Sequence, residues 1–414
     1  MNLYDAFTIL IVLSAIFGYL NYKFLKLPAT IGIMVISLLT SFGIVGLSFF
    51  DTGYLQTTVD AITKLDFPDI LLRIMLSFML FAGAIHIDIK VLDKEKIPVI
   101  IFSTFGVLLS TFIIGILMFF LLQLFGLNVN FIYCLLFGAL ISPTDPIAVL
   151  GILKGANISK SLEMKITGES LFNDGVAVVI FITIYEIIKS GLQEFNIFDI
   201  FILFMREAGG GVIFGFILGY AGYLLLKSID NYKVEVMITL AIVMGGYSLA
   251  YFLHISGPLA MVVAGIIIGN RGKKYAMSET TREYLDKFWE LIDEILNAIL
   301  FILIGFEILI IKKDINYIEI GLISIILVLL SRYLSLGISI LMMKFKRTFP
   351  KNTIWVLTWG GLRGGISVAL ALSLTQTMQS GLFVTITYII VIFSILVQGL
   401  TIGKYVKRLK LSEN

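Results

Sequence analysis

Long apolar runs dominate this sequence and limit the folds that it can adopt. Many of them reach roughly 18 residues or more, which is enough for a helix to cross a bilayer. The chain of 414 residues is 58% hydrophobic and 14% charged, and its mean hydropathy is +1.00. Few soluble domains have such a composition. The sequence therefore predicts an all-α polytopic membrane protein.

The apolar runs predict thirteen transmembrane helices, separated by loops too short to hold a soluble domain. The first run carries Asp5 and has no basic segment before it, so we expect a transmembrane helix and not a cleaved signal peptide. The single cysteine, Cys134, permits no intrachain disulfide, and we expect no cofactor. The expected helices are 3–20, 29–49, 69–87, 97–124, 130–150, 161–188, 200–226, 234–253, 256–270, 286–311, 315–343, 353–375 and 381–403.

The distribution of basic residues predicts how the chain is oriented in the cell membrane. With the N-terminus outside, 23 of the 31 Lys and Arg residues fall in inside segments and five fall in outside segments. The positive-inside rule then favours an outside N-terminus, a cytoplasmic C-terminus and an odd number of helices. The other three, Arg73, Arg332 and Arg363, fall within expected helices.

Two of the expected helices contain signals for a break. Pro143 and Pro146 flank Thr144 and Asp145, and prolines at this spacing prevent a regular helix from continuing. Unwound backbone at membrane depth is tolerated only where protein or a water-filled cavity satisfies it. The second signal is TWGGLRGGISVALAL (358–372), where four glycines surround Arg363 and lower helix propensity. Close helix packing is the alternative explanation for these glycines.

The two breaks are related in sequence. TDPIAV (144–149) overlays RGGISV (363–368), and the two copies are seven helices apart. An odd difference in helix number makes the copies run in opposite directions through the membrane. An inverted repeat with one discontinuous helix in each half is typical of secondary transporters, whose substrate site lies near the midplane.

A polar helix face in GESLFNDGVAVVIF (168–181) supplies the candidate site. At about 100° per residue, Glu169, Ser170, Asn173 and Asp174 share one face of the expected helix. A charge at the bilayer centre costs about 2.5–3.5 kcal/mol on insertion scales, which favours a functional role. A carboxyl group there can hold a proton or, when ionised, a hard monovalent cation. Competition between the two, combined with alternating access, would give cation/proton exchange.

Asp174 is the first candidate for the ion-binding carboxylate because no basic residue is positioned in the sequence to neutralise it. Ser170, one turn earlier, and Thr144 at the break would add oxygen ligands. Asp145 could also contribute, or it could cap the half-helix that begins at Pro146, with Arg363 as its counter-charge.

The other polar residues have structural explanations. Glu169 could pair with Lys165 one turn before it, but Arg332 is favoured because that charge otherwise lacks a partner. Asn173 is a further candidate ligand of the cation, or it could hydrogen-bond a neighbouring helix, as amides in membranes often do.

Three motifs together resemble a known family. TDP (144–146), GES…FND (168–174) and WGGLRGGIS (359–367) resemble the monovalent cation/proton antiporter superfamily, in its NhaP-type sodium/proton exchanger branch. The resemblance implies a single membrane domain over 1–414, with inverted six-helix repeats at about 1–190 and 234–408 and a linker helix at about 200–226. It also implies a core domain, a dimerisation domain, a homodimer, and discontinuous helices that cross at 144–145 and near 361–364.

By the same resemblance, Asp174 would bind both the cation and the proton, with oxygens from Ser170 and Thr144, while Glu169 and Arg332 would form a structural ion pair. Asn173 stands where the electrogenic branch has a second Asp, which implies electroneutral exchange of one cation for one proton. Many members carry an acidic residue in the third helix, where this chain has Ala82. Asp145 or water would then complete the coordination.

We therefore expect an antiporter of sodium or lithium against protons, and not an enzyme. A potassium/proton antiporter of the same fold is the first alternative. An ion channel is less favoured because the sequence has no filter-like repeats or polar rings. An intramembrane aspartyl protease would use Asp145 and Asp174 as its dyad, but Asp145 is wedged between prolines. The expected partners are monovalent cations, protons, lipid and a second copy of the chain, with no nucleic acid.

Overall fold

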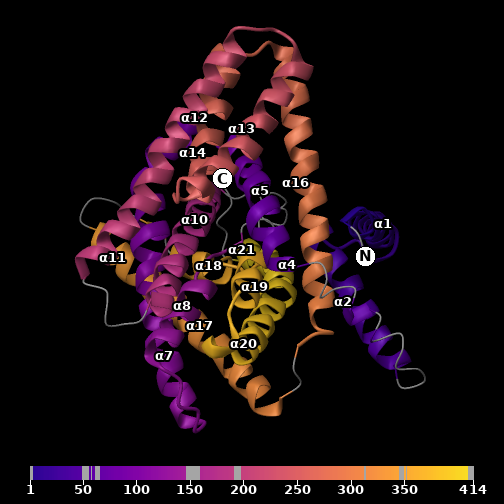
Figure 1. Cartoon of the computed structure of the whole chain (residues 1–414), viewed down its shortest axis with the longest axis vertical. Helices are drawn as coiled ribbons and strands as arrows, with labels where there is room; N and C mark the ends of the chain where they lie inside the picture. The colour runs from indigo at the N-terminus through magenta and orange to yellow at the C-terminus, as the bar shows by residue number, and fades with distance from the viewer. Residues whose placement is uncertain are drawn as a thin grey trace.

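The computed structural model describes residues 3–48, 56, 58–60, 66–145, 159–190, 197–311, 314–344, 349–350 and 352–408. Within these ranges the regular structure is helical, and the helices pack into one bundle (Figure 1). Nine helices of the described part are long and apolar enough to cross a membrane. Each of the thirteen expected ranges contains helix, so the all-α polytopic class is confirmed, while thirteen complete spans stay a prediction.

The first part of the chain, up to the candidate site helix, is built as follows. Its elements are α1 Leu3–Leu20, η1 Asn21–Leu25, α2 Ala29–Leu47, α4 Phe67–Asp69, η2 Ile70–Met75, α5 Leu76–Ile85, α6 Ile89–Ile101, η3 Phe102–Gly106, α7 Val107–Leu124, α8 Phe131–Ile141 and α10 Lys160–Ser190. The elements written η are short π-helical turns here, and several of them join two α-helices into one longer helix.

The second part continues in the same manner. Its elements are α11 Ile197–Phe204, η4 Met205–Gly209, α12 Gly210–Lys227, α13 Tyr232–Phe252, α14 Gly257–Ile267, η5 Ile268–Gly272, α15 Lys273–Tyr275, α16 Glu279–Glu307, α17 Ile315–Met343, α18 Thr353–Trp359, α19 Gly365–Leu372, η6 Gln376–Met378, α20 Ser380–Phe393, η7 Ser394–Gly399 and α21 Leu400–Arg408. Here η6 is a 3-10 turn.

Two expected helix starts were wrong by about two turns, because polar capping residues lie further upstream. The helix expected from 97 begins at Ile89, where the Asp88 carboxylate accepts a hydrogen bond from the Lys90 amide at 2.8 Å. The helix expected from 286 begins at Glu279, where Ser278 caps the amide of Thr281. Side-chain acceptors at these positions satisfy helix amides that otherwise lack partners. The charged first turns therefore belong to the helices and not to the loops.

The helices pack as two groups that meet along the site. In the first group, α5, α12, α13 and α14 contact one another, and α16 packs against α1, α2, α5 and α13. In the second group, α7, α8, α10, α17, α19 and α20 pack together. Contacts of α10 with α5 and α14, and of α16 with α19, join the groups. The site described below lies at this junction.

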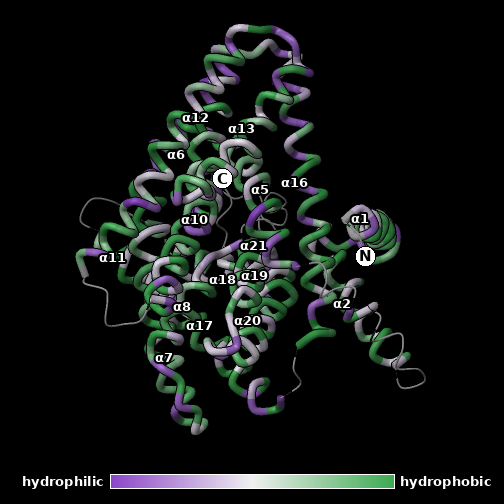
Figure 2. The backbone as a smooth tube through the Cα atoms, viewed as in Figure 1, coloured by the Kyte–Doolittle hydropathy of each residue, from purple (hydrophilic) through white to green (hydrophobic). Residues whose placement is uncertain are grey.

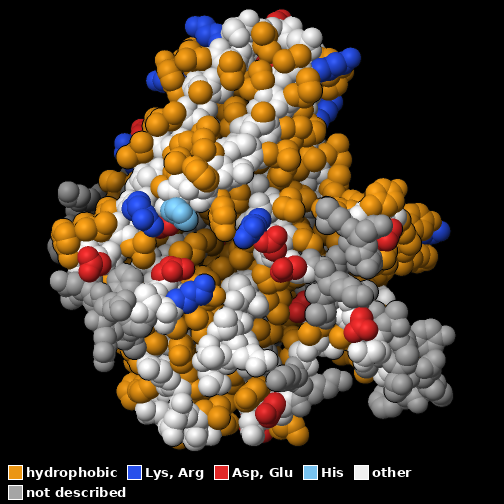
Figure 3. All heavy atoms as spheres, in the orientation of Figure 1, with side chains coloured by type: hydrophobic (Ala, Val, Ile, Leu, Met, Phe, Trp, Pro, Cys, Tyr) orange, Lys and Arg blue, Asp and Glu red, His pale blue; other side chains and the backbone are white. Residues whose placement is uncertain are grey.

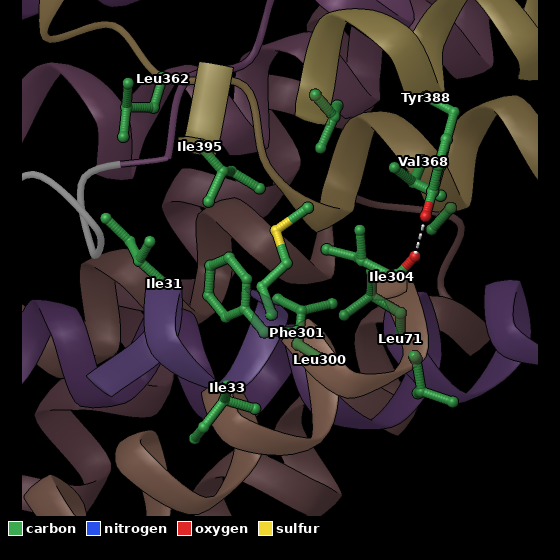
Figure 4. Packing of buried hydrophobic residues seen from close by; sticks show 14 of the residues in the cluster. Ile31, Ile33, Leu71, Leu300, Phe301, Ile304, Leu362, Val368, Tyr388 and Ile395 are labelled. Atoms are coloured by element: carbon green, nitrogen blue, oxygen red, sulfur yellow. Dashed lines mark hydrogen bonds between the residues drawn. The ribbon is translucent and has the colours of Figure 1, made fainter. Parts of the chain in front are cut away.

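The packed interior is apolar, as Figure 4 shows where α2, α16 and α20 come together. Ile31, Phe301 and Val368 are buried there, and the Tyr388 hydroxyl donates to the Ile304 carbonyl at 2.7 Å. Apolar residues also cover much of the outside of the helices (Figure 2). On the face in Figure 3, charged side chains gather mainly in the middle and at the upper tip, between extended hydrophobic surfaces. A surface of this kind suits lipid contact.

Candidate functional site

The first helix break is held in place by the polar face of α10. Helix α8 ends at Ile141, and the Thr144 amide donates to Asn173 Oδ1 at 3.3 Å. Asn173 Nδ2 donates in turn to Thr144 Oγ1 at 2.7 Å, and the hydroxyls of Thr144 and Ser170 lie 2.9 Å apart. All three residues are buried. The side chains of α10 thus replace the backbone hydrogen bonds that the break removes. The half-helix expected from Pro146 lies outside the described residues.

The second break crosses the first. Helix α18 ends at Trp359 and α19 begins at Gly365, so the break expected around Arg363 is confirmed and close packing does not explain its glycines alone. The Asp145 amide donates to the Leu362 carbonyl at 2.7 Å. This hydrogen bond forms an isolated antiparallel bridge between the two unwound segments. The predicted crossing of two interrupted helices is thereby confirmed up to Asp145.

Arg363 meets the carbonyl end of α8. Its guanidinium donates to the Ser142 carbonyl and, at 2.9 Å, to the Pro143 carbonyl, and its amide donates to Ser394 Oγ at 2.9 Å. The residue is only 2% exposed. A cation at a helix C-terminus offsets the partial negative charge of the unpaired carbonyls. This contact with backbone was not foreseen from the sequence, which suggested Asp145 as the partner.

Glu169 forms its ion pair with Arg332 on α17. Arg332 Nη1 lies 2.5 Å from Glu169 Oε1, and both side chains are buried. Lys165, the alternative partner, pairs instead with Glu95 at 3.1 Å. Close approach of Arg332 to the second break requires Gly361, since a Cβ there would lie 2.8 Å from Arg332 Nε. The pair thus fixes α10 to α17 beside the crossing.

A cavity of about 1300 Å³ reaches the break from one end of the bundle. Its rim includes the exposed residues His86 and Lys160, and its inner wall includes Thr144, Asp145 and Asp174. Asp174 is 7% exposed, and within the described residues it forms no ion pair. The cavity therefore gives water and small ions a path to a carboxylate that no basic side chain of the described residues neutralises.

The predicted site residues fall into two sets. Thr144, Asp145 and Asp174 line the cavity, whereas Ser170 and Asn173 lie behind Thr144 and are hydrogen-bonded to it. Asn173 hydrogen-bonds a neighbouring segment, as expected, since both ends of its amide are engaged by Thr144, and its role as an ion ligand stays a prediction. Ala82 also lines the cavity, with a methyl group in place of an acidic side chain.

Sequence reasoning also missed the polar residues that α16 contributes to the cavity wall, and Asp293 and Asn297 are two of them. They are one turn apart in a helix whose first half is amphipathic and charged. A signal for them was present in the sequence. The two polar residues, spaced i and i+4, continue the charged face of the helix into its apolar half.

Comparisons with known proteins agree with this geometry. The family described as "Sodium/hydrogen exchanger, transmembrane" matches residues 11–408. The chain is 50% identical, over 98% of its length and 96% of the relative's, to the Na(+)/H(+) antiporter NhaP of Pseudomonas aeruginosa. This chain belongs to the sodium/hydrogen exchanger family. A second exchanger, the Na(+)/H(+) antiporter NhaH of Halobacillus aidingensis, is 33% identical over 94% of both chains.

The exchanger fold is also recognised in a solved structure. The sodium proton antiporter MjNhaP1 from Methanocaldococcus jannaschii superposes with a TM-score of 0.76 at 20% sequence identity, and the match covers 100% of both chains. At this level of identity the match shows that the two chains share a fold. The predicted membership of the NhaP-type branch is confirmed by the family and the relatives together.

Proposed function

We propose that this protein is a secondary active antiporter that exchanges sodium, or lithium, for protons by alternating access. The observation that carries the proposal is Asp174, a buried carboxylate without a basic partner that lies on the wall of a cavity beside a broken helix. Two relatives that cover most of the chain are named Na(+)/H(+) antiporters, which supports the same activity.

The exchange follows from competition for one carboxylate. Ionised Asp174, with oxygens of Thr144 and Asp145 nearby on the cavity wall, offers the hard ligands that a small monovalent cation prefers. Protonation removes the negative charge and releases the cation. Because Asp174 holds either species but not both, movement of the site between the two membrane faces couples their fluxes in opposite directions. No cofactor enters this cycle.

We further propose an electroneutral exchange of one cation for one proton. Asn173 contributes no charge, and its amide is engaged in holding Thr144. Asp174 is then the one carboxylate of the α10 face that changes charge during transport, since Glu169 is paired with Arg332. If Asp174 alone carries the exchange, its rate in vesicles should not vary with an imposed membrane potential. A steep dependence on potential would contradict the proposed stoichiometry.

The orientation and assembly are proposed together. The cavity rim carries Lys160 and lies next to Lys273, on the basic face that the positive-inside rule places in the cytoplasm. The cavity would therefore open inward, with the N-terminus outside. We propose that the chain is one membrane domain made of two inverted repeats joined by the α11–α12 segment, and that two copies form a homodimer.

Proton flux in everted membrane vesicles tests the proposal directly. With an imposed proton gradient, added sodium should dissipate the gradient, and Asp174→Asn should abolish the response, because the amide cannot exchange a proton for a cation. Asp230→Asn, which removes a charge from the exposed α12–α13 loop, is the matched control and should leave the response intact. Normal exchange in Asp174→Asn would refute the assignment.

Potassium is the second candidate cation, since Ala82 leaves one side of the cavity without a charged ligand. Fewer charged ligands weaken the preference for a small, strongly hydrated ion. The same vesicle experiment with sodium, lithium and potassium across a range of pH decides between the two antiporters.

A further inference from the structure

Asn297 on α16 is a buried polar residue for which the protein provides only half of the hydrogen-bond partners. Its amide nitrogen donates to the Asp293 carbonyl oxygen at 2.8 Å. Its oxygen, Oδ1, is buried and has no hydrogen-bond partner among the described residues, and the residue is only 2% exposed while it lines the cavity. Leaving a buried acceptor unsatisfied costs about 1–3 kcal/mol. An unsatisfied acceptor on a residue of the cavity wall is suited to a small ligand that enters from the cavity.

The neighbouring charges identify that ligand as a cation. The Asp293 carboxylate, one turn before Asn297, lines the same cavity as Asp145 and Asp174. Nearer the rim, Lys273 is engaged by Asp286, and the described residues show no ion pair for Asp293. Carboxylates that repel each other across a cavity are stabilised by a cation between them.

We propose that the Asp293 carboxylate and the Asn297 amide oxygen form a second cation site, which holds a partly hydrated sodium ion between the cavity mouth and Asp174. This inference rests on the proposed exchange. Carboxylate and amide oxygens are suitable ligands for a hard cation, and water in the cavity would complete the shell. Since α16 and α10 belong to different packing groups, the ion passes from one group to the other as it approaches the break.

The sodium dependence of exchange separates this role from a structural one. Asp293→Asn should raise the half-saturating sodium concentration about tenfold, equivalent to about 1.4 kcal/mol, and change the maximal rate less than about twofold. Asp293→Glu should restore most of the affinity. The control is Glu279→Gln, an exposed acidic residue in the first turn of the same helix that does not line the cavity, with an expected effect below about twofold. The second site would be overturned if Asp293→Asn and the control raised the half-saturating sodium concentration equally. A loss confined to the maximal rate in Asp293→Asn would overturn it as well.

Variants of Asn297 test the uncharged ligand. Asn297→Leu removes the oxygen ligand and should raise the half-saturating sodium concentration, as Asp293→Asn does. If this variant does not fold, Asn297→Asp serves instead, because it keeps an oxygen at the same position and should bind sodium at least as well as the parent. A higher half-saturating sodium concentration in folded Asn297→Asp would contradict the proposal.

Equilibrium binding of radioactive sodium to the purified full-length chain distinguishes this inference from the proposed function. Asp174→Asn should retain weak sodium binding, and the double variant with Asp293→Asn should lose it. Equal binding by the single and double variants would overturn the second site even if Asp174→Asn abolishes exchange, which would leave the antiporter assignment intact. Exchange that survives Asp174→Asn would instead defeat the assignment itself.

Discussion

The two helix breaks differ in how they are made and in what they present. The first, at 142–145, is made by proline, and its Thr144 and Asp145 line the cavity. The second, at 360–364, is made by glycine, and its Arg363 is buried against the carbonyl end of α8. In the proposed cycle, one break supplies ion ligands, while the other supplies a positive charge that contacts the carbonyl end of α8. Two segments of similar sequence therefore present different groups.

Removal of Arg363 should have the largest effect on this arrangement. In Arg363→Met, the Ser142 and Pro143 carbonyls lose their donor in a buried site, at a cost on the order of 2–5 kcal/mol. Exchange should be lost and thermal unfolding of the purified protein should occur at a lower temperature. Arg363→Lys keeps one donor and should recover part of the stability. A Met variant as stable as the parent would show that the second break does not support the first.

Substitution of Gly364 should damage the first break without unwinding either helix. A Cβ there would lie 2.4 Å from Asp145 Oδ2, whereas the backbone at φ −127° is open to any residue. Gly364→Ala must therefore displace the Asp145 carboxylate, and overpacking of about 1–3 kcal/mol should reduce sodium exchange at least tenfold.

The control for this substitution is Gly245→Ala, a helical position of α13 with no atom within 4 Å of the added carbon. It should exchange sodium like the parent. If Gly364→Ala is equally active, the position of the Asp145 carboxylate at the crossing is not important for transport.

Loss of the Ser170 hydroxyl should have the smallest effect. In Ser170→Ala, Thr144 Oγ1 keeps its bond from Asn173 and loses one partner, which is worth about 0.5–1.5 kcal/mol. We expect the half-saturating sodium concentration to rise a few-fold at an unchanged maximal rate. Ser324→Ala, a buried serine on α17 away from the breaks, is the control. An effect as large as that of Gly364→Ala would show that Ser170 contacts the ion directly.

The sequence predicted the chemistry of the site well wherever a residue type is costly in a membrane. Two flanking prolines, a glycine-rich break with a buried arginine, and carboxylates on an apolar helix each violate the rules for a bilayer span, so each is visible without a structure. The pairing of Glu169 with Arg332 was favoured by the same reasoning, because an isolated charge at that depth requires a partner.

The helix starts were predicted less well, since charged residues look alike in a loop and in the first turns of a helix. Asp88 and Ser278 act as caps only because their side chains reach specific backbone amides, and hydropathy carries no information on that geometry. The sequence left the role of Asn173 open for a similar reason. An amide on a polar face can meet an ion or a backbone group, and its contact with Thr144 depends on the relative placement of α8 and α10.

The sequence by itself determined the membrane class, the two breaks and the carboxylate that we propose exchanges an ion for a proton. These properties depend on the free-energy cost of placing polar groups in lipid, and that cost is set by the residues of each segment alone. Only the tertiary structure decided that Arg363 meets the α8 carbonyls, that Asn173 supports Thr144, and that α16 brings Asp293 and Asn297 to the same cavity. Such contacts join residues far apart in the chain, and their geometry is set by the packing of whole helices.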